Sequence, residues 1–312
     1  MDVGIIIVTY NSAAVIGPCL DAAVATGAEI VVVDNASSDG TARIAARPEV
    51  RLIANATNRG FAGAVNQGFS ALKRNYVLLL NPDAVVRTSL KPLCEACDLP
   101  GAAGACGQLV GPDGELQVGF LVRKFPTASV LALEALLLNR LWRGNPINAA
   151  YRGFELDYTS RQVVDQPAGA FLMIRRRVWE QLGGFDERFW PLWFEDVDFC
   201  RRASDRGYCW YYTPDAVAKH AGAHSIFELT LEMRLIYWYG NLLRYSAKHF
   251  RPWGMRAVCL AVVAGCLLRG LIESAVRPSS RPVVAYCKVV RLGCRFFFGR
   301  GDAVRLGADF IG

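Results

Sequence analysis

Polar side chains suited to binding a charged ligand follow three apolar segments of the sequence, each at the point where the segment ends. Asp34 and Asp83 are the acidic members of these groups. A carboxylate in such a place accepts hydrogen bonds from a nucleobase N–H or a ribose hydroxyl, or offers hard oxygen to Mg²⁺ or Mn²⁺. A turn or helix cap is the alternative role for both residues. The groups are Thr9, Tyr10 and Asn11; Asp34 and Asn35; and Asn81, Pro82 and Asp83.

Three further carboxylates, Glu195, Asp196 and Asp198, open a helical segment after an aromatic stretch that contains Trp190 and Trp193. The helix macrodipole by itself favours acidic residues in a first turn. A catalytic role is the competing explanation, because a carboxylate there is placed to take a proton from an acceptor hydroxyl. The aromatic side chains would then form an apolar wall against a sugar.

A glycine-containing loop, Asn58-Arg59-Gly60, leads into another helical segment. Such a loop can present backbone N–H groups to a diphosphate, although a plain helix start with small packing residues has the same pattern. The loop matches neither G-x-G-x-x-G nor a P-loop, which argues against a dinucleotide oxidoreductase or a nucleotide hydrolase.

Two of the three histidines, His220 and His224, follow a strand-like segment over residues 208–213. An imidazole there could complete a metal site with Asp83. A structural or exposed histidine is the alternative.

Strand and helix patterns alternate through the first hundred residues, which predicts βαβ units and a mostly parallel sheet. Ligands bind such sheets at the carboxyl ends of the strands, where the three polar groups lie. Asn11 and Ser12 are expected to cap the first helix. The expected strands are Gly4–Thr9, Glu29–Val33, Val50–Ala54 and Tyr76–Leu80; the expected helices among them run to Ala25, from Thr41, and over Ala62–Lys73.

The pattern changes after about residue 100. Helices are expected near residues 129–142, over 177–182, over 194–206 and over 228–249, with strand-like segments at 162–175 and 208–213. This predicts one domain over residues 1–250, with a nucleotide-binding half (1–100) and an acceptor half (101–250), and a basic helical tail over 251–312.

The tail carries the net charge of the chain. Residues 251–312 hold ten Lys and Arg against three Asp and Glu, whereas the rest of the chain holds 25 of each sign. The longest uninterrupted apolar run there, Ala257–Leu268, has 12 residues, which we take as too short to span a bilayer. Basic, aromatic and apolar residues together predict a helix on an anionic membrane surface; packing on the domain is the alternative.

The start of the chain and its cysteines indicate a cytoplasmic location. The apolar run Val3–Val8 is too short and wrongly flanked for a signal peptide. Ten cysteines without a regular spacing are typical of reduced thiols. We therefore expect a peripheral protein on the cytoplasmic face of the inner membrane.

Taken together and in order, these motifs resemble glycosyltransferase family 2, with a GT-A fold, and look most like its bacterial rhamnosyltransferase-like branch. The resemblance covers residues 3–225. The matching stretches are Val8–Ser12, Val33–Gly40, Asn58–Ala62, Leu79–Asp83, Gly169–Leu172, Gly184–Phe189, Glu195–Asp198 and His220–Ser225.

The resemblance implies an α/β fold of GT-A type, with a mostly parallel central sheet flanked by helices and a C-terminal helical extension. It implies that Asp34 contacts the donor base and that Asp83 is the metal-binding acid of a D-x-D motif. That motif reads Asn81-Pro82-Asp83 here, so its first acid is missing. The implied donor-binding residues are Thr9, Tyr10, Asn11, Asp34, Asn58, Arg59, Gly60, Asn81 and Asp83.

It also implies a catalytic mechanism. Asp196 is the expected general base of an inverting single displacement, with Glu195 as the competing candidate. His220 is expected to join Asp83 on Mg²⁺ or Mn²⁺, with His224 as its competitor. Trp190 and Trp193 are expected to bind the acceptor.

The implied activity moves a sugar, L-rhamnose from dTDP-rhamnose, onto a glycan or polyprenyl-linked glycan during polysaccharide synthesis. A UDP-hexose or UDP-galactofuranose donor is the alternative within the family. A sugar-nucleotidyltransferase would need a glycine-rich phosphate loop after the first strand, where Thr9-Tyr10-Asn11-Ser12 has none. A non-catalytic sugar-binding homologue is the third reading. No nucleic-acid-binding module accompanies the basic tail, so we expect no nucleic acid partner.

Overall fold

The computed structural model describes residues 2–142, 144–222, 229–276, 280–301, 304 and 306 of the 312-residue chain. His224, one of the two candidate metal ligands, lies outside the described residues.

The chain forms two compact units, each built from separated segments. We call them the sheet unit, which is Met1–Phe125, Arg152–Pro191 and Glu195–Ser225, and the helical unit, which is Pro126–Tyr151, Leu192–Phe194 and Ile226–Gly312. This division differs from the expected boundary at residue 250, because the long helix that ends at His249 packs with the tail helices.

Four parallel strands form the first part of the sheet, in the order β3-β2-β1-β4. The β-branched and leucine runs of β1, β2 and β4 are buried, as expected for strands with helices on both faces. The strands are β1 (Val3–Thr9), β2 (Glu29–Asp34), β3 (Val50–Ala54) and β4 (Tyr76–Leu80), within one residue of the expected bounds.

The second part of the sheet continues from β4 in the order β10-β6-β11-β5. Strand β10 runs antiparallel to β4 and to β6, and β11 runs parallel to β6 but antiparallel to β5 and β8. The sheet is therefore mixed, though the parallel core is as predicted. These strands are β5 (Ala84–Val86), β6 (Ala102–Val110), β8 (Gln162–Val164), β10 (Phe171–Arg175) and β11 (Cys209–His220). A separate pair joins β7 (Val122–Arg123) to β9 (Gln166–Pro167).

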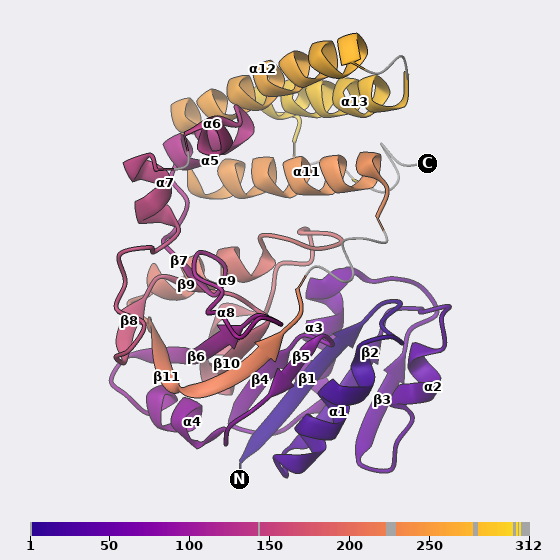
Figure 1. Cartoon of the computed structure of the whole chain (residues 1–312), viewed down its shortest axis with the longest axis vertical. Coiled ribbons are helices and arrows are strands. Elements are labelled where there is room, and N and C mark those ends of the chain that lie inside the picture. Colours follow the sequence, from indigo (N-terminus) through magenta and orange to yellow (C-terminus); the bar gives the residue numbers. More distant parts are fainter. Residues whose placement is uncertain are drawn as a thin grey trace. The chain divides into compact units, whose positions relative to one another are not determined.

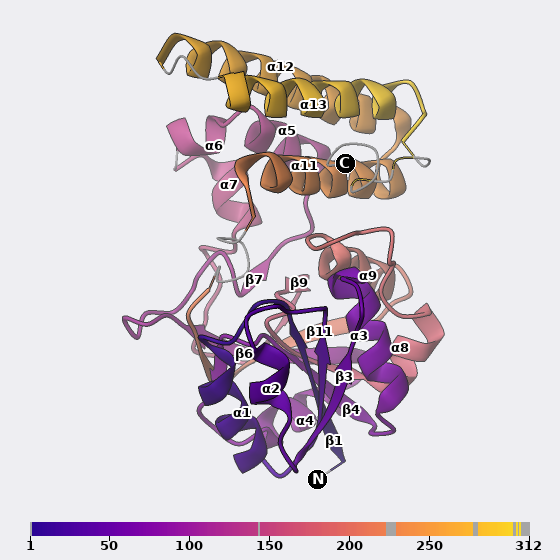
Figure 2. The ribbon, with the colours of Figure 1, turned by 90° about the vertical axis from the view of Figure 1, so that its right-hand side faces the viewer.

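Helices cover both faces of this sheet (Figures 1 and 2), with α3 and α8 on one face and α1 and α4 on the other. Phe69 of α3 stacks on Trp179 of α8 with ring centroids 3.7 Å apart. The expectation that Asn11 or Ser12 caps the first helix is wrong, because Val15 holds the N-cap position. The helices are α1 (Ile16–Ala25), α2 (Thr41–Ala45), α3 (Gly60–Ala71), α4 (Lys91–Cys97), α8 (Arg176–Leu182) and α9 (Glu195–Ser204).

Among its described residues, the helical unit contains the three long helices α11, α12 and α13 and the three short helices α5, α6 and α7. Helices α12 and α13 run side by side (Figure 1). Thr127 and Thr230 cap α5 and α11 by accepting hydrogen bonds from backbone N–H groups of their first turns. The elements are α5 (Ala128–Ala135), α6 (Leu138–Leu141), α7 (Pro146–Tyr151), α11 (Leu231–His249), α12 (Pro252–Val276) and α13 (Ser280–Phe297).

One helix among the described residues is long and apolar enough to cross a membrane by length and composition, namely Pro252–Ala275, with a mean hydropathy of 1.9. Counting only uninterrupted apolar residues was too strict a criterion, because Arg256 and Arg269 interrupt the run without ending the helix. Core helices of soluble proteins pass the same test, and 39% of the most apolar window is buried inside the structure.

A pair of glycine substitutions tests the packing of the sheet. A Cβ added at Gly104 in β6 would lie 2.1 Å from the backbone oxygen of Met173 in β10, so the two strands would have to separate. We expect Gly104→Ala to lower the free energy of unfolding by roughly 1–3 kcal/mol. A Cβ at Gly17 in α1 meets no described atom within 4 Å, and Gly17→Ala is expected to leave stability unchanged or slightly higher. Urea denaturation of both variants makes the comparison, and equal losses would contradict the described register of β6 and β10.

Candidate active site

The carboxylate of Asp34 is held at the end of β2 by three hydrogen bonds. Thr9, its register partner on β1, donates from Oγ1 to Oδ1 at 2.7 Å. Ser37 donates its hydroxyl to Oδ1 at 2.6 Å and its backbone N–H to Oδ2 at 3.0 Å. Two carboxylate oxygens accept more than three hydrogen bonds, so Asp34 keeps capacity for a ligand N–H or hydroxyl in a fixed orientation.

The loop after β1 is joined to the loop after β2. The backbone N–H of Asn11 donates to Ser37 Oγ at 2.8 Å, and the Asn11 side chain accepts from the N–H of Ser38 at 2.9 Å. Asn11 has a φ of 47°, a conformation that asparagine tolerates better than most residues. Tyr10 lies between these anchors and is partly exposed.

Asn35 connects the Asp34 loop to the start of α3. Its side-chain amide donates to the carbonyl of Gly60 at 3.1 Å, and its own N–H donates to Thr9 at 2.8 Å. The first N–H groups of α3 already have partners: Gly60 donates to Asn58 Oδ1 and Phe61 to the carbonyl of Pro191. These two amides are therefore not the ones offered to a diphosphate in this structure, and donor binding by the loop stays a prediction. The sequence places Asn35 in one of the three polar groups but predicts no role for it.

Trp190 packs against the same loop. A Cβ on Gly60, whose φ is 77°, would lie 2.7 Å from Trp190 Cδ1, so only glycine fits there. Arg59 is exposed beside it. Trp193 belongs instead to the helical unit, where it contacts Trp238 edge-on at 5.5 Å. The acceptor-binding role of both tryptophans stays a prediction.

Asp83 and His220 face each other across the paired strands β5 and β11. His220 Nε2 lies 3.4 Å from Asp83 Oδ1, and the N–H of Gly222 donates to Asp83 Oδ2 at 2.9 Å. Burial opposes ionisation of Asp83, but the hydrogen bond and charge of His220 outweigh it, so the pKa of Asp83 lies below its usual value. The two residues expected to share a metal ion thus lie together, while their role as metal ligands stays a prediction.

Two residues that sequence reasoning missed hold His220 in place. Gln117 approaches His220 Nδ1 with its Oε1 at 2.9 Å and donates from Nε2 to the His220 carbonyl at 2.9 Å. Phe120 stacks on the imidazole with centroids 5.3 Å apart. The amide oxygen of Gln117 can only accept, so Nδ1 carries a proton, and the contact orients the ring with Nε2 toward Asp83, as hydrogen-bond partners of metal-binding histidines do.

The acidic helix start is joined to the same sheet edge. Asn81 donates its N–H to the carbonyl of Ala170 at 3.0 Å, and the neighbouring Gly169 donates its N–H to Asp196 Oδ2 at 3.0 Å. Val197 donates to the other oxygen, Oδ1, at 2.8 Å. One short series of contacts therefore runs from the end of β4 to Asp196. Asp34, Asp83 and Asp196 all lie along the edge where β1, β2 and β4 end and β10 begins.

The two acids at the start of α9 differ in their surroundings. Burial raises the pKa of Asp196, while the N–H groups of Gly169 and Val197 and the charge of Arg123 oppose the rise. Burial and then the charge of Asp196 raise the pKa of Glu195 well above its usual value. Glu195 Oε2 is buried and has no hydrogen-bond partner among the described residues. Asp196 is therefore the better placed base, since it is partly exposed and oriented by two N–H groups.

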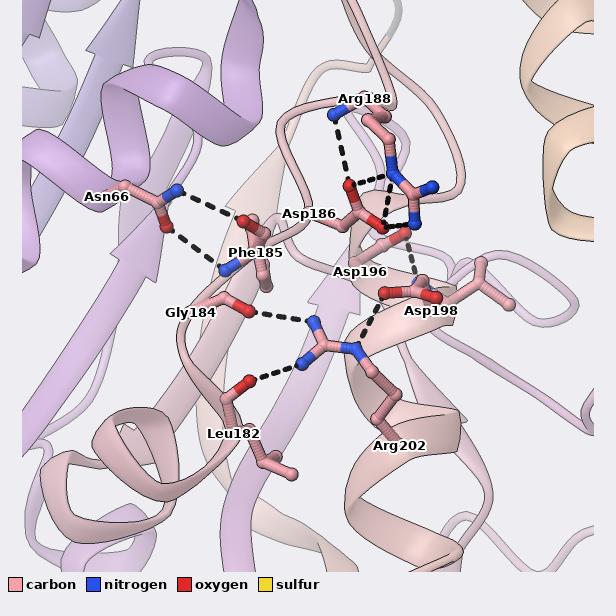
Figure 3. A network of polar contacts seen from close by, with 10 residues as sticks. Asn66, Leu182, Gly184, Phe185, Asp186, Arg188, Asp196, Asp198 and Arg202 are labelled. Atoms are coloured by element: carbon pink, nitrogen blue, oxygen red, sulfur yellow. Dashed lines mark hydrogen bonds and ion pairs between the residues drawn. The ribbon is translucent and has the colours of Figure 1, made fainter. Parts of the chain in front are cut away.

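The rest of the first turn of α9 is held by Arg202 (Figure 3). Arg202 donates to Asp198 Oδ2 at 2.8 Å and to the carbonyls of Leu182 and Gly184, each at 2.7 Å. Asp198 is completely buried. Because Asp198 is two residues from Asp196, this network fixes the helix start that carries the candidate base.

A divalent cation fits the Asp83 and His220 pair only if the ligand completes its shell. The described residues contain no group of three or more His, Cys, Asp or Glu side chains that would hold a metal alone. The Asn81 side chain also approaches this pair, with its amide nitrogen 3.4 Å from His220 Nε2. One carboxylate with phosphate oxygens and water is a usual set for Mg²⁺, and a carboxylate with an imidazole suits Mn²⁺.

Comparison with known proteins identifies the family of this chain. The model of "Glycosyl transferase family 2" matches residues 4–183. An N-acetylglucosaminyl-diphospho-decaprenol L-rhamnosyltransferase of Mycobacterium tuberculosis is 33% identical over 211 residues, which cover 63% of this chain and 67% of that protein. The rhamnosyltransferase WbbL of Escherichia coli is 27% identical over 161 residues, 51% of this chain and 57% of that protein.

A solved structure confirms the fold. The mannosyltransferase PcManGT of Pyrobaculum calidifontis, determined with GDP-Man and Mn²⁺, superposes with a TM-score of 0.53 over 96% of this chain and 88% of its own, at 16% identity. The similarity is one of architecture, which is the GT-A arrangement expected from the sequence.

Two neighbouring arginines test the Arg202 network. Arg202→Gln removes the guanidinium that pairs with the completely buried Asp198, and we expect a loss of roughly 3–5 kcal/mol in the free energy of unfolding. Arg201→Gln removes a pair with Asp205 that is largely exposed, so the expected loss is below about 1 kcal/mol. Denaturant unfolding distinguishes them, and a similar small loss in both would show that the network does not hold α9.

Proposed function

The chain belongs to glycosyltransferase family 2, and we propose that it transfers L-rhamnose from dTDP-rhamnose to a hydroxyl of a glycan or lipid-linked glycan. The observation that carries this proposal is the single edge of the sheet that holds Asp34, the Asp83–His220 pair and Asp196. The names of the two rhamnosyltransferases above support L-rhamnose as the sugar, and that of the mycobacterial protein supports a lipid-linked acceptor.

Asp196 acts as the general base. One of its oxygens accepts from Gly169 and the other from Val197, so the carboxylate cannot rotate. Each oxygen retains a lone pair for the acceptor hydroxyl. Burial raises its pKa, and a carboxylate of higher pKa takes a proton more readily. The acceptor oxygen attacks the anomeric carbon from the face opposite the diphosphate, and the configuration inverts.

Asp34 holds the donor base or ribose through its remaining acceptor capacity, in an orientation set by Thr9 and Ser37. Asp83 and His220, with Asn81 beside them, would hold Mg²⁺ or Mn²⁺. When bound, such a cation neutralises charge on the departing diphosphate.

Within the family, a UDP-hexose or UDP-galactofuranose remains the alternative donor, because the contacts to Asp34 described here do not distinguish thymine from uracil. A sugar-nucleotidyltransferase would need a glycine-rich loop at Thr9-Tyr10-Asn11-Ser12. The match to glycosyltransferase family 2 includes this segment, so the sugar-nucleotidyltransferase alternative loses its support. A non-catalytic homologue would not need the oriented Asp196.

The first test of the mechanism replaces the two adjacent acids separately. Asp196→Asn keeps the shape but cannot take a proton, so we expect kcat to fall by about 10²–10⁴ while donor affinity is retained. Glu195→Gln is the matched control and should keep most activity. In the parent enzyme kcat/KM should rise with pH as Asp196 loses its proton, with a midpoint above the value near 4 that is usual for aspartate. Near-normal turnover by Asp196→Asn would contradict the assignment of Asp196 as the general base.

The second test identifies the donor and the metal by thermal stability. At a hundred times its Kd, a ligand stabilises the native state by about 2.7 kcal/mol. We expect dTDP-rhamnose with Mn²⁺ to raise the melting temperature more than UDP-glucose or UDP-galactofuranose does. His220→Ala should remove the Mn²⁺-dependent part of the shift, and Asp34→Asn the nucleotide-dependent part. Asp113→Asn, in the exposed turn after β6, should change neither. A larger shift with UDP-sugars would replace the proposed donor.

A further inference from the structure

Helix α12 carries a continuous stripe of exposed apolar side chains. Trp253 and Leu271 are each 71% exposed, and Leu260 is 58% exposed. The positions recur every three or four residues, so they lie on one face of the helix. The exposed members are Trp253, Ala257, Leu260, Ala264, Leu267, Leu268, Leu271, Ile272 and Ala275.

The opposite face of α12 is already used inside the helical unit. Val258, Val262 and Cys266 are completely buried there. Arg269 also points inward, donating to the carbonyls of Gly265 and Ala135 and lying over the ring of Tyr239. The exposed stripe is therefore a different face of α12 from the one that packs inside the helical unit. It is a second apolar face, which a helix of a soluble bundle does not need.

Cations border this stripe, and acids are almost absent. Arg251 and Arg256 are exposed at the start of α12, and Arg291 and Arg300 are exposed on or just after α13. Over the described residues 251–301 the one acid is Glu273, which is partly buried. Two such surfaces would repel each other, whereas an anionic surface would attract both the charge and the apolar side chains.

We propose that this stripe, with its flanking arginines, docks the chain on the surface of an anionic lipid bilayer, with α12 lying in the plane of the membrane. A helix of 25 residues is about 37 Å long and presents its apolar face to the acyl boundary along that length. Val284 of α13, the helix that packs beside α12, and Phe298 just after α13 are also exposed. Docking on the membrane would bring the enzyme to the lipid-linked acceptor of the proposed function. Only this interpretation of the docking rests on the proposed function.

Vesicle sedimentation with the full chain tests the docking surface. We expect the protein to pellet with vesicles of phosphatidylcholine and phosphatidylglycerol, and less with phosphatidylcholine alone. Leu267→Glu with Leu271→Glu should weaken binding by at least about tenfold, because two acyl-facing leucines become charged. Arg251→Gln with Arg291→Gln should reduce binding to the anionic vesicles and its dependence on salt.

Val163→Glu is the matched control, since Val163 is exposed and apolar but lies on β8 of the sheet unit. It should bind vesicles like the parent. Transfer to a water-soluble acceptor should be unchanged in the leucine variant, which shows that it folds and separates this test from the proposed function. Unchanged vesicle binding by the leucine variant would overturn the proposal. So would a dimer in light scattering that these substitutions dissociate, or resistance to carbonate extraction, which would indicate a spanning helix.

Discussion

The antiparallel return of β10 beside β4 is the constraint on which the site depends. A parallel strand in that place would begin at the far edge of the sheet, and Gly169 and Ala170 would lie away from the ends of β1, β2 and β4. Because β10 runs the other way, its first residues meet the last residue of β4, and Asn81 can donate to the Ala170 carbonyl. Asp196 then reaches this edge through Gly169.

The acids along this edge are separated in role by their surroundings. Thr9 and Ser37 give Asp34 hydroxyl and amide donors, which orient it for a neutral hydrogen-bond partner. His220 lowers the pKa of Asp83, so that carboxyl is ready to face a cation. Burial does the opposite for Asp196 and favours proton transfer. In the proposed mechanism, carboxylates of one type would thus serve recognition, charge binding and base catalysis, because each has different neighbours.

The sequence allowed the parallel half of the fold and several later helices, such as α8, α9 and α11, to be predicted, but not strands β5 and β6. Strands β1, β2 and β4 consist mainly of Val, Ile and Leu, whose pattern predicts buried strands directly. Strand β6, AAGACGQLV, was missed because alanine and glycine have low strand propensity. Its glycines are required by packing: a Cβ at Gly107 would lie 2.3 Å from the carbonyl oxygen of Ala216. Likewise, Gln117 and Phe120 touch His220 from about a hundred positions away, and no local pattern predicts such a contact.

For the basic tail, composition predicts which kinds of residue are present. Which of them face solvent depends on the side of the helix on which each residue lies. Charge counting found the cations, and hydropathy found an apolar run, but neither says which residues face outward. In the helical unit, Arg269 turns toward the carbonyl of Ala135, whereas Leu267 and Leu271 turn to solvent. This inverts the usual arrangement of a surface helix, in which the long cation is exposed and leucine is buried. A solvent that accepts leucine better than water does would remove that conflict, and the acyl boundary of a bilayer is such a solvent.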